Sequence, residues 1–268
     1  MSGDPHVVTF KDVKYSWHGG CTAILSRSVK LGIEIHVRTH RIETRKVAYS
    51  YIADVAAKVC GNIIEVAGAD GSLIVSGEKK LITMSDSAGA LSLSGGCSLV
   101  KTVKGSRGQI VVYDLDLGGD RSMQIRANTN NGMIYVDLYG SYPNAEGLLG
   151  STSSEALLGR DGVTDFAGNF NSFAEDWQVL NTEQNLFQEL HGPQHPAGCV
   201  YDASMMDKKG EDSKRPFIRR RLMDRDAVTL EEAKKACTNT MDVEKRKLCV
   251  TDVMAVGDIE IAEDAFYN

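Results

Sequence analysis

The sequence lacks any long apolar run. No stretch of about 18 consecutive apolar residues occurs among its 268 residues, so we predict no membrane-spanning segment. It also lacks an excess of basic residues. The formal net charge is −6, which argues against a general nucleic-acid-binding protein, because such proteins usually present a basic surface. The length suits one large domain, or one domain with an appendage.

Motifs that carry common enzymatic chemistry are missing as well. The sequence has no G-x-S-x-G nucleophile elbow before a helix, and no GxxxxGK[ST] loop that would hold a phosphate group. We therefore predict no enzymatic activity on an external substrate.

The six cysteines are scattered, and none lies in a C-x-x-C pair. This spacing argues against structural zinc and against thioredoxin-like redox chemistry. An even, scattered set favours disulfides and hence an oxidising, extracellular or secretory compartment, with six reduced thiols in a cytosolic protein as the alternative. The six are Cys21, Cys60, Cys97, Cys199, Cys237 and Cys249.

Residues from Val7 to about Val179 have the pattern of β-strands. In residues 31–40, LGIEIHVRTH, the apolar side chains occupy alternate positions and the polar ones, His36 and Arg38 among them, occupy the opposite face. We expect that polar face, which His36, Arg38 and His40 share, to be solvated or to face a ligand. Turn-forming pairs separate further strands at Asp70-Gly71, Gly118-Gly119 and Asn131-Gly132. Short strands at this spacing, without alternating helices, predict a mainly β protein with an antiparallel β-sandwich.

The composition changes after the β-rich region. We assign residues 3–203 to a β domain and residues 204–228, which are charge-dense, to a linker. Residues 229–268 predict a small C-terminal α-helical hairpin. Its first helix begins with a capping box of Thr229 and Glu232, its second begins at Asp242, and Cys237 and Cys249 close it.

Three stretches carry a family resemblance. Residues 3–25 read GDPHVVTFKDVKYSWHGGCTAIL, residues 147–150 read GLLG, and residues 173–179 read FAEDWQV. They resemble the opening, the G-L-x-G turn and the closing F-x-x-S-W-x-V of von Willebrand factor type D (VWD) domains. The resemblance spans residues 3 to about 199. It implies a β-sandwich module of secreted or cell-surface proteins that adheres, assembles or organises extracellular material.

The resemblance also implies a disulfide framework. In the family, the cysteine after GDPH is bonded to one just beyond the tryptophan, which corresponds here to Cys21 with Cys199. Once the resemblance assigns that pair, Cys60 is left to pair with Cys97, and Cys237 with Cys249.

Many family members bind one calcium ion, through an aspartate of a T-F-D-G motif and a loop after G-L-x-G. Here Lys11 stands at the aspartate position, and Asp12 follows one residue late. Calcium needs six to eight oxygen ligands. A rebuilt calcium site would use Asp12, Asp161 and Asp165. We favour the alternative, in which Asp161-Gly162 is simply a β-turn.

The Asp4-Pro5 bond is acid-labile. A protonated Asp4 can attack its own carbonyl carbon, the proline nitrogen leaves once it takes a proton, and His6 is placed to supply that proton. Some mucin relatives are cut at this bond, whereas in most relatives the motif persists as a turn. We favour the turn here, with self-cleavage as the alternative.

The basic run Arg219, Arg220 and Arg221 is either a site for a processing protease or a solvated stretch.

These observations favour a non-enzymatic structural or adhesive module whose partners are other extracellular proteins or further copies of the chain. The alternatives are a domain that carries lipid or another small ligand and a calcium-dependent binding module. A lipid carrier should expose a wide apolar groove, which the polar strand positions do not suggest.

Overall fold

The computed structural model forms two compact units, Met1–Arg41 with Ser50–Tyr201 and Ile42–Tyr49 with Asp202–Asn268. The residues that the structure describes are 6–17, 19–43, 48–75, 90–104, 110–180, 182–188, 190, 228–239, 243–256, 259 and 262.

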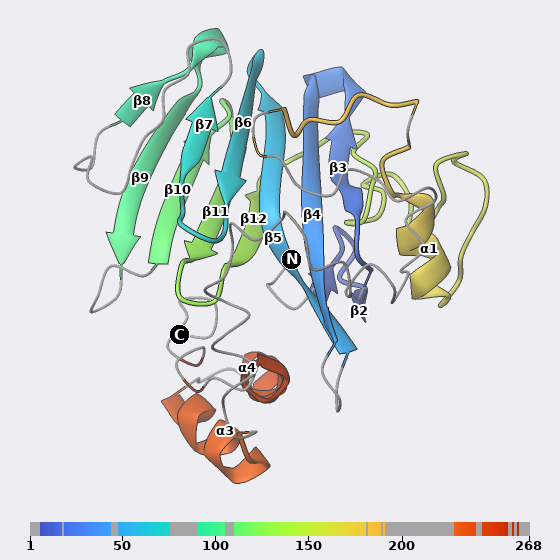
Figure 1. Ribbon diagram of the computed structural model, residues 1–268. Helices are drawn as coiled ribbons and strands as arrows, with labels where there is room; N and C mark the ends of the chain where they lie inside the picture. Colours follow the sequence, from blue (N-terminus) through green and yellow to red (C-terminus); the bar gives the residue numbers. More distant parts are fainter. Residues whose placement is uncertain are drawn as a thin grey trace. The chain divides into compact units, whose positions relative to one another are not determined.

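Two five-stranded antiparallel sheets dominate the fold (Figure 1). In each sheet the strands follow one another in chain order, so each sheet is a meander. The first sheet contains β3 (Thr22–Ser28), β4 (Ile33–Glu43), β5 (Ala48–Val59), β6 (Asn62–Ala67) and β7 (Leu73–Val75). The second contains β8 (Ala90–Ser92), β9 (Ser98–Lys104), β10 (Ile110–Asp116), β11 (Ser122–Asn128) and β12 (Met133–Tyr139). A hairpin of β1 (His6–Val8) and β2 (Lys14–Ser16) precedes them.

The two sheets pack through one shared core. Alternation decides which side chains enter it: in β10 the side chains of Val111, Tyr113 and Leu115 are buried, whereas those of Asp114 and Asp116 are exposed. Fully burying a large apolar side chain contributes roughly 1.5–3 kcal/mol, so the core that both sheets line is the main source of stability. The predicted antiparallel sandwich is confirmed.

The predicted turns are also confirmed. Gly118 and Gly119 adopt φ angles of 82° and 70°, at which a residue with a side chain would be strained. The Asp116 carboxylate accepts the Gly118 N–H at 2.9 Å. Asp70 accepts the Ser72 N–H in the turn between β6 and β7. Single-turn 3-10 helices occur at η1 (Val29–Leu31) and η2 (Ser94–Gly96).

Helix α1 (Phe170–Asp176) departs from the expectation of continuous β structure. The Asn169 side chain caps it by accepting the Ser172 N–H, and the helix buries Phe173 and Ala174. Phe170, Phe173 and Ala174 lie at i, i+3 and i+4, so they share one face of the helix and pack on the core, and with a good cap this is enough for a helix this short.

Strand β3 is the edge of its sheet, and two later segments cover it. The Arg27 and Glu146 backbones exchange both hydrogen bonds, at 2.7 and 3.0 Å. Farther along, the Val179 N–H donates to the Thr22 carbonyl at 2.9 Å, and the Ile24 N–H donates to the Trp177 carbonyl at 2.9 Å. The edge is therefore paired and closed to other strands.

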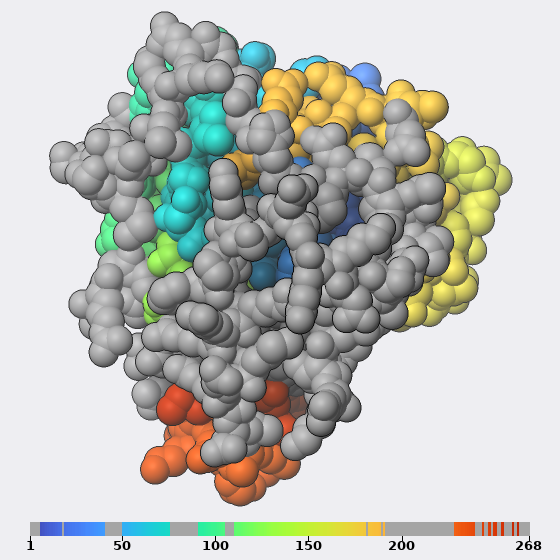
Figure 2. All heavy atoms as spheres, in the orientation of Figure 1, coloured from blue at the N-terminus to red at the C-terminus, as the bar shows by residue number. Residues whose placement is uncertain are grey.

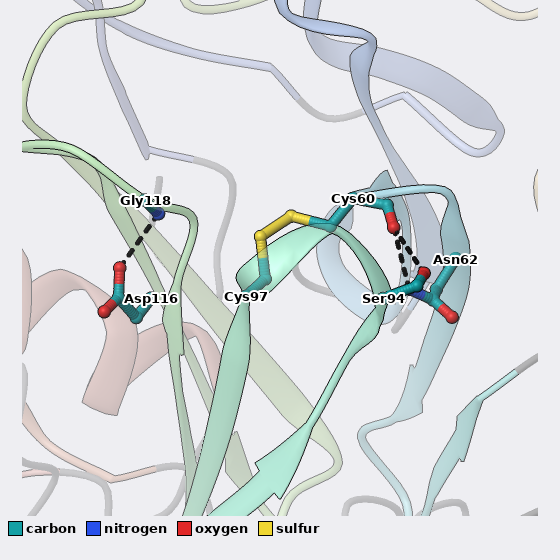
Figure 3. Close-up of a disulfide and its surroundings, with 6 residues drawn as sticks. All are labelled: Cys60, Asn62, Ser94, Cys97, Asp116 and Gly118. Atoms are coloured by element: carbon teal, nitrogen blue, oxygen red, sulfur yellow. Dashed lines mark hydrogen bonds between the residues drawn. A yellow bond between two sulfur atoms is a disulfide. The ribbon is translucent and has the colours of Figure 1, made fainter.

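A disulfide joins the two sheets. Cys60 follows β5 of the first sheet and Cys97 precedes β9 of the second, and their Cα atoms are 6.3 Å apart (Figure 3). The Ser94 hydroxyl and the Asn62 amide both donate to the Cys60 carbonyl, at 2.7 and 2.9 Å. The predicted pair is confirmed. Cys21 is also in a disulfide, and its predicted partner Cys199 lies outside the described residues.

The helical hairpin of the second unit matches its prediction. Its elements are α3 (Leu230–Ala236), η5 (Cys237–Asn239) and α4 (Val243–Val256), and a disulfide joins Cys237 to Cys249. The capping box of Thr229 and Glu232 is present in both directions. Within the described part of the chain, no helix is both long and apolar enough to cross a membrane. Residues 204–227, with Arg219, Arg220 and Arg221, lie outside the described residues.

We expect the double variant Cys60→Ser/Cys97→Ser to lose about 3–4 kcal/mol of unfolding free energy, because its denatured state is no longer restrained. The restraint closes a loop of 37 residues. Urea unfolding measures the change. Cys60→Ala/Cys97→Ala should match it, which separates the bridge from any effect of a buried hydroxyl; an unchanged midpoint in both variants would contradict the prediction.

Candidate functional site

The outer face of the first sheet is not solvated as expected. The side chain of His36 has no exposure and Arg38 is 3% exposed. They are buried because the segment of residues 182–188 and 190, here called the strap, crosses this face. In Figure 1 the strap runs across β3, β4 and β5, and in Figure 2 its gold atoms form part of the surface. Leu186 and Phe187 pack there on Ala56.

Buried polar side chains hold the strap. The Glu65 carboxylate, 1% exposed, accepts the Gln188 N–H at 3.1 Å and the Leu190 N–H at 2.8 Å. Nδ1 of His36 accepts the Leu186 N–H at 3.3 Å. Since Nδ1 is the acceptor, the ring proton resides on Nε2, which lies 2.9 Å from the Glu34 carboxylate.

Arg38 connects the strap to the sheet. Its guanidinium donates to the Leu190 carbonyl at 3.0 Å and to the Asp54 carboxylate at 3.3 Å, and it lies 4.0 Å from the ring centroid of Phe187. Arg38 and Asp54 are both almost fully buried, so each needs the other: removing one partner of a buried ion pair typically costs about 3–5 kcal/mol. The ionisable groups of this face are therefore engaged in structural bonds.

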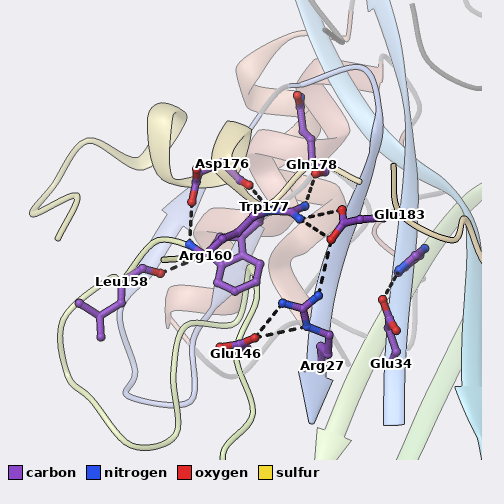
Figure 4. A network of polar contacts seen from close by, with 10 residues as sticks. Arg27, Glu34, Glu146, Leu158, Arg160, Asp176, Trp177, Gln178 and Glu183 are labelled. Carbon is purple, nitrogen blue, oxygen red and sulfur yellow. Dashed lines mark hydrogen bonds and ion pairs between the residues drawn. The ribbon is translucent and has the colours of Figure 1, made fainter. Parts of the chain in front are cut away.

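A second polar network surrounds Trp177, and we call it the arginine clamp (Figure 4). It consists of Arg27, Glu146, Arg160, Trp177 and Glu183. The guanidinium groups of the two arginines lie 5.9 and 5.6 Å from the indole ring. The indole N–H donates to the Leu158 carbonyl at 3.3 Å.

Glu183 bridges the two arginines of the clamp. Its oxygens accept from Arg160 at 2.6 and 2.7 Å, and Arg27 lies 3.6 Å away. Arg27 also pairs with Glu146 at 2.9 Å. Arg160 donates further to the backbone carbonyls of Asp176 and Gln178. The clamp thus ties the covering segments of β3 to the strand itself.

The environment of the clamp alters carboxyl acidity. Partial burial alone would raise the pKa of Glu183, but hydrogen bonds from Arg160 and the Leu180 N–H, with the charges of both arginines, lower it overall. The hydrogen bond with His36 lowers the pKa of Glu34, against partial burial, and the charge of Arg27 adds to the lowering.

The stretches that carry the VWD resemblance meet around β3. The Tyr15 hydroxyl donates to the Leu148 carbonyl at 2.6 Å, and the Leu148 N–H donates to the Ile24 carbonyl at 3.0 Å. Gly147 has a φ of 137°, and a Cβ there would lie 2.7 Å from the Leu25 carbonyl oxygen, so this close approach requires glycine. Sequence reasoning used Trp177 only as a motif residue and missed Arg27, Arg160 and Glu183, because separate single charges carry no local signal.

The proposed calcium ligands are used locally. Asp161 accepts the Val163 and Thr164 N–H groups at 2.9 and 2.8 Å and the Thr164 hydroxyl at 2.6 Å. These bonds, that of the hydroxyl first, lower the pKa of the Asp161 carboxyl. Asp165 accepts the Ala167 N–H. Asp12, with φ of 59°, lies in the turn after β1. The described residues contain no group of three His, Cys, Asp or Glu side chains that could hold a metal ion, so the structure does not bring these three together.

The opening motif is described only in part. Nδ1 of His6 lies 2.8 Å from the Ser16 hydroxyl, across the β1–β2 hairpin. Asp4 and Pro5 lie outside the described residues, so self-cleavage stays a prediction.

No protein-family model and no curated protein sequence matches this chain.

We expect Glu65→Gln to loosen the strap. The amide offers one acceptor where the carboxylate offers two, so one strap N–H loses its partner, at a cost of about 1–3 kcal/mol. Hydrogen exchange at the Gln188 and Leu190 amides should accelerate, and urea unfolding should show the lost stability. Glu155→Gln, which alters an exposed carboxyl elsewhere, is the control. Unchanged exchange in Glu65→Gln would refute the assigned role.

Acid should weaken the arginine clamp. The pKa of Glu183 lies below its ordinary value of 4.5, so its stabilisation is complete above that value and is lost as pH falls through the lower folded-state pKa. We expect Glu183→Gln to have a lower Tm at neutral pH and a flatter decline of Tm between about pH 5 and pH 3. Glu155→Gln should keep the wild-type slope, and an equally steep decline in Glu183→Gln would contradict the prediction.

Proposed function

We propose that this chain is a structural or adhesive module of a secreted or cell-surface protein, of the VWD type. It works by binding other extracellular proteins or further copies of itself, and it does not catalyse a reaction on an external substrate.

The observation that carries the proposal is the disulfide between Cys60 and Cys97. A covalent bond across the two layers of a sandwich persists in an oxidising compartment, where structural and adhesive proteins act. It also prevents the sheets from separating when the chain is pulled, which suits a module that transmits force between partners.

The use of the buried ionisable groups supports a non-catalytic role. His36, Arg38 and Glu65 are the kinds of side chain that enzymes use as acids, bases and charge stabilisers. Here each is buried and bonded to the strap. The meeting of the three resembling stretches around β3 supports the family assignment.

A bead-adhesion experiment tests the proposal. Beads coated with the full, oxidised chain should cluster with one another or bind to a deposited extracellular matrix, whereas beads coated with reduced and alkylated chain should do neither. Running both in EDTA and in millimolar calcium identifies any calcium-dependent binding. The expected result is adhesion that needs the oxidised fold and is equal in both solutions.

Other outcomes would favour the alternatives. Absence of adhesion, with lipid co-purifying at one molecule per chain by mass spectrometry, would replace the proposal with a lipid carrier. Adhesion only in calcium would make the module calcium-dependent. Intact mass also tests self-cleavage, because cutting at Asp4-Pro5 removes the first four residues.

A further inference from the structure

The outer face of the second sheet bears a hollow of about 220 Å³. It lies across β9, β10, β11 and β12, and its lining includes Val100, Asp114, Asp116, Gln124 and Tyr139. Val112 and Tyr135 on this face are buried, whereas around the hollow Val100 is 38% and Tyr139 is 52% exposed. Val100 on β9 and Tyr139 on β12 stand at opposite sides of the hollow, with β10 and β11 between them, and both offer exposed apolar surface that a partner can cover.

Two carboxylates in the hollow have no cationic partner among the described residues. One oxygen of Asp114 accepts from the Gln124 amide at 2.6 Å, and one oxygen of Asp116 accepts the Gly118 N–H at 2.9 Å. These bonds hold both carboxylates in place and leave the second oxygen of each for a ligand. Asp137 lies on β12, across Gln124 from Asp114, and its carboxylate is already paired with Arg126 at 2.6 Å.

The spacing of these carboxylates matches an extended peptide. Asp114 and Asp116 are two residues apart on β10, so they lie on one face and repeat every 7 Å or so. Side chains on one face of an extended peptide have the same repeat. Arginine or lysine at alternate positions would thus meet both carboxylates. Val100, beside Asp114 on β9, and Tyr139, across β11 on β12, would offer apolar surface to their aliphatic stems.

We propose that this hollow docks an extended basic segment of a partner protein, with arginine or lysine side chains two residues apart. The inference rests on the proposed function, because it names the partner class of a protein-binding module. A neutral sugar would leave both carboxylates without a counter-charge, and an anionic lipid surface or a nucleic acid would be repelled.

Two fluorescent peptides of identical composition test the proposal on the full chain. One has alternating order, Arg-Thr-Arg-Thr-Arg, and the other has blocked order, Arg-Arg-Arg-Thr-Thr. By fluorescence anisotropy the alternating peptide should bind more tightly, and salt should weaken its binding because the contacts are exposed ion pairs. Equal affinity of the two peptides, or no binding of either, would overturn the proposal.

A matched pair of variants locates the site. Asp114→Asn/Asp116→Asn removes two charges but keeps an acceptor oxygen for Gln124 and for Gly118, so the fold should persist with an unchanged Tm. Binding of the alternating peptide should weaken roughly three- to twentyfold. Glu155→Gln/Glu175→Gln removes the same charge from exposed residues outside the hollow and should leave binding unchanged. If peptide binding weakened equally in both variants, the effect would come only from the net charge of the protein, and the assignment of the site to the hollow would be overturned.

Two further outcomes separate this inference from the proposed function. Displacement of the alternating peptide by a neutral oligosaccharide would reassign the hollow to sugar binding. Adhesion of Asp114→Asn/Asp116→Asn beads at the wild-type level, with no peptide binding to the wild-type chain, would remove the docking inference alone. Peptide binding without bead adhesion would retain the hollow and contradict the adhesive role.

Discussion

Strand β3 has only one neighbour in its sheet, so the backbone groups along its other side must find hydrogen-bond partners elsewhere. They find them in two segments that follow more than 100 residues later, at Glu146 and at Trp177–Val179. The Gly147 turn, the capped helix α1 and the arginine clamp all serve to bring those segments into place. The parts of the sequence that resemble VWD domains are the parts that satisfy this edge.

The clamp is built from charges, and its value lies in geometry as much as in energy. The cost of removing water from partly buried charges offsets much of their Coulomb attraction, so such ion pairs contribute modestly to net stability. Arg27, Arg160 and Glu183 instead restrict the covering segments to one arrangement against β3. The two guanidinium groups and the indole of Trp177 fix how the covering segments meet β3.

The outer faces of the two sheets differ in which polar side chains they leave exposed. On the first, the strap buries His36, Arg38 and Glu65 and consumes their hydrogen-bonding capacity. On the second, Asp114, Asp116 and Tyr139 stay exposed around a hollow. Asp114 and Asp116 each keep one carboxylate oxygen outside their hydrogen bonds to Gln124 and Gly118. This difference between the faces is the physical basis for the proposal that a partner binds at the hollow.

Local chemistry explains what could be read from the sequence alone. The alternation in β4 and β10, the turns at Gly71, Gly118 and Gly132, and the capping box at Thr229 each depend on a few neighbouring residues. The pairing of Cys237 with Cys249 likewise joins two nearby residues. These elements could be predicted because the residues that determine each of them are close together in the sequence.

Only the tertiary structure decided which polar residues are buried and what they bind. The alternation in β4 placed His36 and Arg38 on a polar face, but it cannot indicate that the strap covers that face. Phe170–Asp176 became a helix because the core could receive Phe173. The favoured turn at Asp161, by contrast, forms through bonds to its own neighbours, and the described residues contain no group of three His, Cys, Asp or Glu side chains that could hold a metal ion. Contacts between distant segments depend on packing, which no local pattern encodes.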